Sequence, residues 1–151
     1  EIRPRDWSSD VCSSDLFDWR AVADGDVGAV RDASLRFSRT DHPPPTMAVE
    51  VTADDHRLVY TADTGPRWSP EVFAPRADLV LSEATYLHDD IRAPLHLSAR
   101  QAGEYARAAG AKRLMLTHLW PTVDPVASVA EGSEAFGDDA LLAAPDLSIR
   151  V

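Results

Sequence analysis

Short stretches in which apolar and polar residues alternate occupy residues 33–61 of the chain. They predict two or three strands, over residues 35–38, 47–52 and 58–61, because successive side chains of a strand point to opposite faces of a sheet. The acidic pair Asp54-Asp55 suits the turn between the second and third strands. This part of the chain is therefore predicted to form a β-meander.

Beyond residue 63 the pattern changes to short, continuous apolar runs separated by helical segments. The apolar runs predict buried strands over residues 78–82, 114–116, 141–143 and 147–151. A short helix is expected over residues 69–73, where Ser69 can cap and Pro70 can take the first helical position.

Two longer helices are indicated by the residues at their ends. Ser98 and Gln101 form a capping box, and Gly110 ends the helix that they begin. Asp124 and the proline after it begin the second helix, which Gly137 ends. Its buried stripe is predicted to be Val126, Val129, Ala130 and Phe136. A meander followed by alternating strands and helices predicts an α/β fold with a mixed sheet.

Length, charge and cysteine content narrow the class of protein. The 151 residues suit one domain, and the net charge of −10 weighs against an extended basic groove for nucleic acid. No apolar run of about 18 residues or signal-peptide core is visible, so we expect a cytoplasmic protein without membrane association. The single cysteine, Cys12, cannot form an internal disulfide.

Residues 1–16 differ in character from the rest of the chain. They are rich in serine and aspartate, repeat the triplet Ser-Ser-Asp, and lack helical or strand periodicity. They resemble translated sequencing adaptor, so we expect a non-native or disordered segment and leave it out of the fold prediction.

The residues that can carry chemistry follow predicted strands or border predicted helices. His42, Asp63 and His118 each lie just beyond a strand, and His96 lies two residues before a helix cap. Ligands at strand ends are typical of the binding edge of an α/β sheet. Imidazole and carboxylate groups together suit zinc, with manganese and iron as competitors.

Taken singly, scattered histidines and aspartates are more often surface residues or core partners than metal ligands. The remaining histidines, His56 and His88, lie in acidic turns and loops and are interpreted as solvated.

The ordered motifs resemble a known family. The stretches TDHPPPTMAVEVTADDHRLVYTADTGP, DLVLSEATY and HLSARQAGEYARAAGAKRLMLTHLWP are similar to the second half of the metallo-β-lactamase superfamily, in the branch of ribonuclease Z and related phosphodiesterase-like hydrolases. The resemblance covers residues 17–151. It implies part of an αββα sandwich, with helices on the outer face of the sheet and a dinuclear site at one edge.

The resemblance also implies a role for each candidate residue. His42 binds the first metal and His118 the second, while Asp63 bridges both, although Ala62 replaces the glycine usual before this aspartate. His96 corresponds to a histidine that acts as proton donor or transition-state stabiliser beside the scissile group.

Glu83 occupies the position of a family acid that orients His96 or a ligand. A purely structural acid, which caps a helix or ties a loop, is an equally good interpretation of this residue.

The family's His-x-His-x-Asp-His motif does not occur in residues 1–41. Residues 17–151 are therefore expected to be the C-terminal half of a metallo-β-lactamase-fold domain. Because each metal then lacks protein ligands, we expect this chain alone to bind zinc weakly or not at all and to be inactive.

The predicted activity of the intact parent is hydrolysis of a phosphodiester or other small, ester-like anionic substrate through a hydroxide bound to two zinc ions, or to Mn²⁺ or Fe²⁺. The resemblance also allows a homodimer. One alternative is tRNA 3′ processing, but only twenty residues separate His42 from Asp63, too few for the long exosite arm of ribonuclease Z enzymes. Another is a non-catalytic half-domain that acts as an interaction module.

Overall fold

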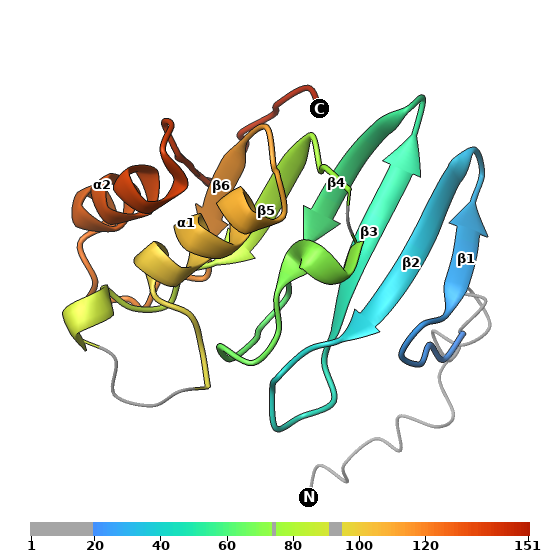
Figure 1. The fold of residues 1–151 in the computed structure, drawn as a ribbon, viewed down its shortest axis with the longest axis horizontal. Helices are drawn as coiled ribbons and strands as arrows, with labels where there is room; N and C mark the ends of the chain where they lie inside the picture. The colour runs from blue at the N-terminus through green and yellow to red at the C-terminus, as the bar shows by residue number, and fades with distance from the viewer. Residues whose placement is uncertain (1–19, 74, 91–94) are drawn as a thin grey trace, which may run out of the picture.

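The computed structural model describes residues 20–73, 75–90 and 95–151, so the expectation for residues 1–16 lies outside the described part of the chain. The described residues form one mixed sheet of seven strands, ordered β1 to β7 as in the sequence (Figure 1). The predicted α/β class with a mixed sheet is confirmed.

The first four strands form the predicted antiparallel meander, with one strand more than the largest number expected. They are β1 (Val27–Val30), β2 (Ala33–Arg39), β3 (Met47–Ala53) and β4 (His56–Tyr60). Asp54 and Asp55 form the predicted turn, with φ of 48° and 63°, a left-handed pair typical of two-residue hairpins. The prediction missed β1, since four residues that include Gly28 give little strand signal.

The remaining strands continue the sheet in parallel from β4. They are β5 (Leu79–Glu83), β6 (Leu114–Thr117) and β7 (Leu141–Leu142). The segments between them contain η2 (Pro70–Phe73), η3 (His88–Asp90), α1 (Ala99–Ala108) and α2 (Pro125–Phe136). No helix in the described residues is long and apolar enough to cross a membrane.

A strand predicted over residues 147–151 is absent from the structure. The backbone N–H of Leu147 donates to the carbonyl of Ala144, which forms a turn after β7. Beyond this turn, residues 147–151 pair with no described strand, and because Leu147 is exposed and Ile149 only half-buried, their apolar residues do not form the buried strand that was predicted.

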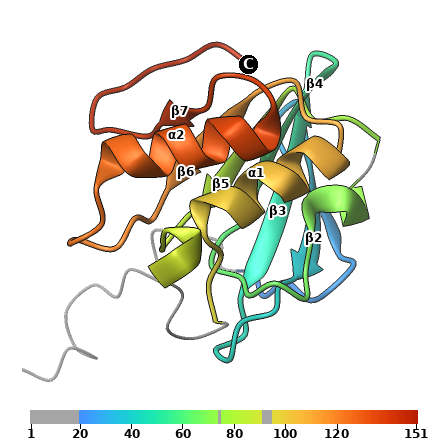
Figure 2. The same ribbon diagram turned by 60° about the vertical axis from the view of Figure 1, so that its left-hand side comes forward.

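Helices α1 and α2 lie side by side over one face of the sheet (Figure 2). The Ser98–Gln101 capping box, the Asp124 cap and the left-handed Gly137 are present as predicted. The predicted stripe of α2 is wrong at two positions, because Val126 is 76% exposed and Ala130 is exposed. The residues that α2 buries are Ser128, Gly132 and Phe136.

The sheet has one face covered by the helices and one face that no described helix covers (Figure 2). On the helix side, Val59, Val80 and Leu114 are paired neighbours in successive strands and belong to the hydrophobic core. The opposite face carries Leu35, Phe37, Val49, Val51, Leu58 and Leu81. These six apolar residues, here called the open face, are all half-buried.

Candidate metal centre

The predicted site residues meet at one edge of the sheet. His42, Asp63 and His118 follow β2, β4 and β6, and Glu83 ends β5. These four strands run in the same direction, so their carboxyl ends share an edge. His96 reaches the same edge from the segment before α1.

The three histidine rings form a continuous row. The centroid of the His96 ring lies 5.1 Å from that of His42 and 5.3 Å from that of His118. The Nε2 atom of His118 lies 3.7 Å from Oδ1 of Asp63. One potential ligand atom from each of His42, Asp63 and His96 falls within 4.8 Å of the others, and Glu83, His96 and His118 form a second such group.

Two residues at this edge adopt left-handed backbone conformations that non-glycine residues rarely take. Ala62, directly before Asp63, has φ of 50°, and His118 has φ of 56°. The conformation of Ala62 explains the usual glycine at this family position, since glycine adopts positive φ without steric cost. Positive φ at a ligand position is typical of backbone strain held at a functional site.

Glu83 is a buried carboxylate whose oxygens are fully engaged by hydrogen-bond donors. Its side chain is 1% exposed. Oε1 accepts from the Thr64 backbone N–H at 2.5 Å and from Nδ1 of His96 at 3.0 Å, and Oε2 accepts from the Thr85 hydroxyl and the Leu97 N–H. Four donors occupy the carboxylate's acceptor positions, an arrangement that favours a supporting role for Glu83 over metal ligation. It both ties loops together and orients His96.

Hydrogen bonds fix the proton positions on His118. The hydroxyl of Thr85 has one proton and two neighbours that only accept, Oε2 of Glu83 at 2.8 Å and the His118 carbonyl at 3.2 Å. Nδ1 of His118, 2.9 Å from this hydroxyl, is therefore the donor in their hydrogen bond. In the neutral ring, Nε2 then carries a lone pair.

The same reasoning applies to the other two histidines. The Thr46 hydroxyl donates to the Pro44 carbonyl, so Nδ1 of His42, at 3.3 Å, donates to the hydroxyl oxygen. Nδ1 of His96 donates to Glu83. All three rings thus use Nδ1 as the donor to a supporting group and leave Nε2 free.

This donor set fits a divalent metal. Three imidazole Nε2 atoms and the Asp63 carboxylate are ligand types that zinc and similar ions take, and each histidine has the supporting acceptor that metal-binding histidines usually have. The sequence did not reveal Thr46 and Thr85, because a threonine near a histidine is too common to be a signal.

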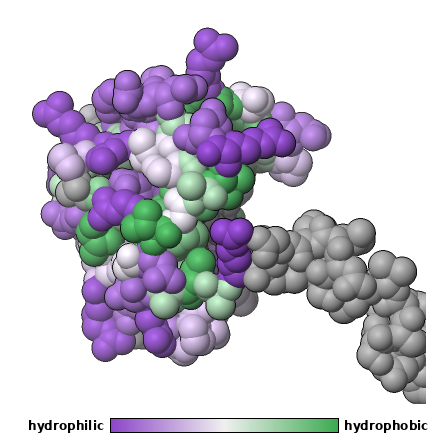
Figure 3. Space-filling model, turned by 90° about the vertical axis from the view of Figure 1, so that its right-hand side faces the viewer, coloured by the Kyte–Doolittle hydropathy of each residue, from purple (hydrophilic) through white to green (hydrophobic). Residues whose placement is uncertain are grey.

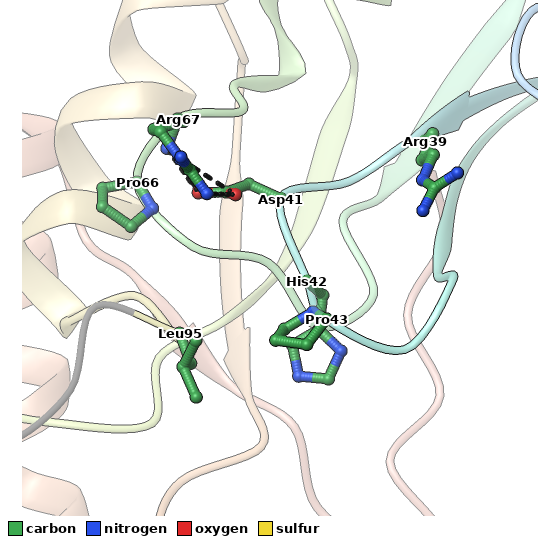
Figure 4. A pocket seen from close by; sticks show the side chains of 7 residues that line it. All are labelled: Arg39, Asp41, His42, Pro43, Pro66, Arg67 and Leu95. Atoms are coloured by element: carbon green, nitrogen blue, oxygen red, sulfur yellow. Dashed lines mark hydrogen bonds and ion pairs between the residues drawn. The ribbon is translucent and has the colours of Figure 1, made fainter.

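A cavity of about 530 Å³ adjoins His42 and includes Arg39 and Arg67 in its lining (Figure 4). Arg67 pairs with both carboxylate oxygens of Asp41, and its hydrogen bonds hold the pKa of Asp41 below its ordinary value. The carbonyl of Asp41 accepts from the Gly65 N–H at 2.7 Å. These bonds join the loop that carries His42 to the loop that carries Asp63.

The two remaining histidines differ in environment. His56 is exposed, as predicted, and lies 3.8 Å from Asp78. His88 is half-buried with Nδ1 3.1 Å from the Ser98 hydroxyl, so it is not the solvated residue that the sequence indicated.

The fold and the histidine row identify this chain as a metallo-β-lactamase-fold protein. The chain belongs to the family described as "Beta-lactamase superfamily domain", whose model matches residues 15–119, more than half of the chain.

Two curated relatives and one solved structure illustrate the similarity. The chain is 38% identical over 87 residues to "Probable metallo-hydrolase YhfI" of Bacillus subtilis, which covers 57% of this chain and 36% of that protein. It is 38% identical over 103 residues to "Ribonuclease Z" of Halorubrum lacusprofundi, covering 65% and 33%. The crystal structure of B. subtilis YhfI, 25% identical, superposes with a TM-score of 0.75 over 90% of this chain and 58% of that one. The chain thus spans about a third of the length of these two curated relatives.

Proposed function

We propose that this chain forms one side of the active site of a metal-dependent hydrolase, with zinc as the metal. The observation that carries the proposal is the set of three histidines whose Nε2 atoms are left free beside Asp63. His42, Asp63 and His118 are proposed to hold the metal. The family's His-x-His-x-Asp-His motif, which the printed sequence does not contain, would complete the ligand set.

When bound, the metal would supply Lewis acidity, which lowers the pKa of coordinated water and stabilises negative charge on the substrate. His96 is proposed to act in its imidazolium form, giving the proton at Nε2 to the departing oxygen while the proton at Nδ1 stays hydrogen-bonded to Glu83. Glu83 acts as a positioning residue that holds this ring and the Asp63 loop in place.

The proposed substrate is small, ester-like and anionic. Arg39 lines the cavity beside His42 and provides positive charge there, whereas the charge of Arg67 is paired with Asp41 in the same lining. Similarity to ribonuclease Z keeps tRNA processing as a second candidate. Against it, β3, β4 and their two-residue turn occupy most of the twenty residues between His42 and Asp63, so an RNA-binding arm has no place there.

Metal binding is the first test. Zinc titration of the full chain against a competing chelator should give weak binding, and Asp63→Ala should weaken it at least tenfold, since the bridging carboxylate is lost. Asp139→Ala, which removes an exposed carboxylate beyond α2, is the matched control. Equal zinc affinity in wild type and Asp63→Ala would refute the proposed ligand.

Activity is the second test. The chain should be joined to a segment that carries the His-x-His-x-Asp-His motif and assayed on bis(p-nitrophenyl) phosphate and on a precursor tRNA. We expect hydrolysis of the small diester, with a loss of at least a hundredfold in Asp63→Ala. Cleavage of the tRNA alone would favour the second candidate, and equal activity in Asp63→Ala would exclude the metal mechanism.

A further inference from the structure

A second cavity, of about 420 Å³, lies beside His96. It is formed by η3, the two residues that precede it, and the segment between β6 and α2. Its lining residues are Tyr86, Leu87, Asp90, Trp120, Thr122, Val123 and Asp124. None of these residues has a part in the proposed metal chemistry.

Two aromatic rings form a wall of this cavity. The Tyr86 ring lies 6.5 Å from the Trp120 ring at 32° and 6.3 Å from the His96 ring at 74°. Tyr86 therefore connects the cavity directly to the proposed proton donor. A ligand group that contacts Trp120 would be separated from His96 only by the ring of Tyr86.

Trp120 is exposed although its backbone is held in place. The side chain is 54% exposed. The backbone N–H of Trp120 donates to the Thr85 carbonyl at 3.1 Å, and the backbone carbonyl of Trp120 accepts from the Val123 N–H at 2.9 Å. Tryptophan and tyrosine are enriched at binding surfaces because an apolar ring carries a polar group, and here the two rings lie together in one cavity lining.

The polar groups that line the cavity indicate which chemical groups an aromatic ligand should carry. Asp90 and Asp124 contribute carboxylates, which accept hydrogen bonds and attract positive charge. Asp124 uses Oδ1 to cap α2, and Asp90 is exposed. Among the described lining residues there is no basic side chain, in contrast to the cavity beside His42, which contains Arg39 and Arg67.

We propose that this cavity is a substrate subsite for a planar aromatic group that bears N–H donors or a positive charge. The ring stacks on Trp120 and Tyr86, and its donors face Asp90 and Asp124. Its role in selecting a substrate rests on the proposed hydrolase function, whereas binding of the ring does not. The ester-like part of the substrate then lies toward the histidine row and its anionic part toward Arg39.

The test uses two planar probes of nearly equal shape, benzamidine and benzoate. Benzamidine is a cation with N–H donors, and benzoate is an anion that only accepts hydrogen bonds. Each is titrated into the metal-free full chain while the indole N–H signals of the tryptophans are followed by NMR, with Trp120→Phe used to assign the Trp120 signal. Benzamidine should shift the Trp120 signal, and benzoate should not.

Three variants separate specific binding from general attraction to an acidic protein. Trp120→Ala should weaken benzamidine binding at least tenfold. Asp90→Asn should weaken it severalfold while the shape of the cavity is retained, and Val72→Ala, which shortens an exposed apolar side chain on η2, should leave it unchanged. For Trp120→Ala, binding is followed on the backbone signals of Thr122 and Val123.

The subsite is refuted if benzoate shifts the Trp120 signal as strongly as benzamidine, or if Asp90→Asn and Trp120→Ala bind benzamidine as the wild type does. Asp63→Ala distinguishes this result from the metal proposal. It should lose zinc affinity and keep benzamidine binding, and Trp120→Ala should show the reverse. Loss of both properties in either variant would contradict the separation of the two sites.

Discussion

At the scale of single residues, Glu83 connects the segments around the candidate site and contacts the proposed proton donor, His96, only at Nδ1. It is one of the most buried side chains in the described structure and receives donors from three separate segments, at Thr64, Thr85 and His96–Leu97. Two interpretations of this residue followed from the sequence, a loop-tying acid and an orienting acid. Its four hydrogen bonds combine them, since the bonds that tie the loops are also the bonds that hold the ring of His96.

Glu83→Gln should lower the free energy of unfolding by about 2–3 kcal/mol, because a buried amide NH₂ would face N–H and O–H donors that now meet an oxygen. Urea denaturation measures the change. Glu104→Gln, on the exposed side of α1, is the matched control and should change stability by less than about 0.5 kcal/mol. A loss in Glu83→Gln no larger than in the control would contradict the bonding scheme.

Asp78 gives a prediction for the dependence of stability on pH. Its carboxylate accepts from Nζ of Lys112 at 2.7 Å and from the Arg57 N–H at 2.8 Å, and these bonds lower its pKa below 3.8. A lowered folded-state pKa stabilises the protein above pH 3.8, and this contribution is lost as pH falls through the folded-state value.

Asp78→Ala should therefore cost about 1–2 kcal/mol at pH 7, and the difference from wild type should disappear in acid. Unfolding by urea at a series of pH values from 7 to about 3 tests this. A difference that stays constant across the series would show that the carboxylate charge has no part in the effect.

At the scale of elements, the sequence predicted what depends on local signals. The capping residues Ser98 and Asp124 marked where two helices begin, and the pair Asp54-Asp55 marked a turn. Features that depend on contacts between distant segments were not accessible. The buried side of α2 is set by its close approach to α1, which favours small residues such as Gly132 over the apolar residues that a helical stripe would select.

The candidate site shows the same difference between local signals, which the sequence reveals, and contacts between distant segments, which it does not. Positions at strand ends, which are a local pattern, only suggested the ligand candidates, and the resemblance of the surrounding motifs to the family gave each candidate its predicted role. The threonines that fix the tautomers, Thr46 and Thr85, were not found, because their role depends on which carbonyl or carboxylate lies beside each hydroxyl.

The contact between α1 and α2 makes Gly103 a sensitive position. A Cβ atom there would lie 2.5 Å from the Gly132 carbonyl oxygen and 2.8 Å from Cβ of Ala135. Gly103→Ala should cost at least about 1–3 kcal/mol, since backbone must move to accept it. Thermal denaturation provides the measurement. Gly28→Ala, whose Cβ would meet only Phe37 at 3.8 Å, is the matched control and should change stability by less than about 1 kcal/mol.

At the scale of the whole molecule, the two faces of the described sheet differ, because helices cover one face and no described helix covers the other (Figure 2). The helices bury the core on one face, while the open face presents six half-buried apolar side chains. On the β1 side of the molecule, hydrophobic surface lies among hydrophilic surface (Figure 3). Val27 and Val30 are exposed on this edge strand. Apolar surface of this extent favours association.

The double substitution Val49→Thr and Val51→Thr on the open face should reduce binding of the dye ANS and increase the monomer fraction in size-exclusion chromatography, because it makes this face more polar without changing side-chain shape. Val59→Thr makes the same chemical change on the helix-covered face, where the side chain is buried. It should leave ANS binding undiminished and cost about 1–3 kcal/mol, because it buries a hydroxyl in the core. Equal effects of the two changes would show that the faces do not differ in exposure.

Because β2, β4, β5 and β6 run in the same direction, the candidate site lies at their carboxyl ends, and their amino ends carry none of the proposed ligands. The turns at residues 31–32 and 54–55 lie at the end of the strands opposite to the histidine row (Figure 1). A fluorescent label or a short peptide tag inserted at residues 54–55 would be a strand's length from every proposed ligand. This turn is therefore the natural attachment point for probes that must report on the protein without disturbing its chemistry.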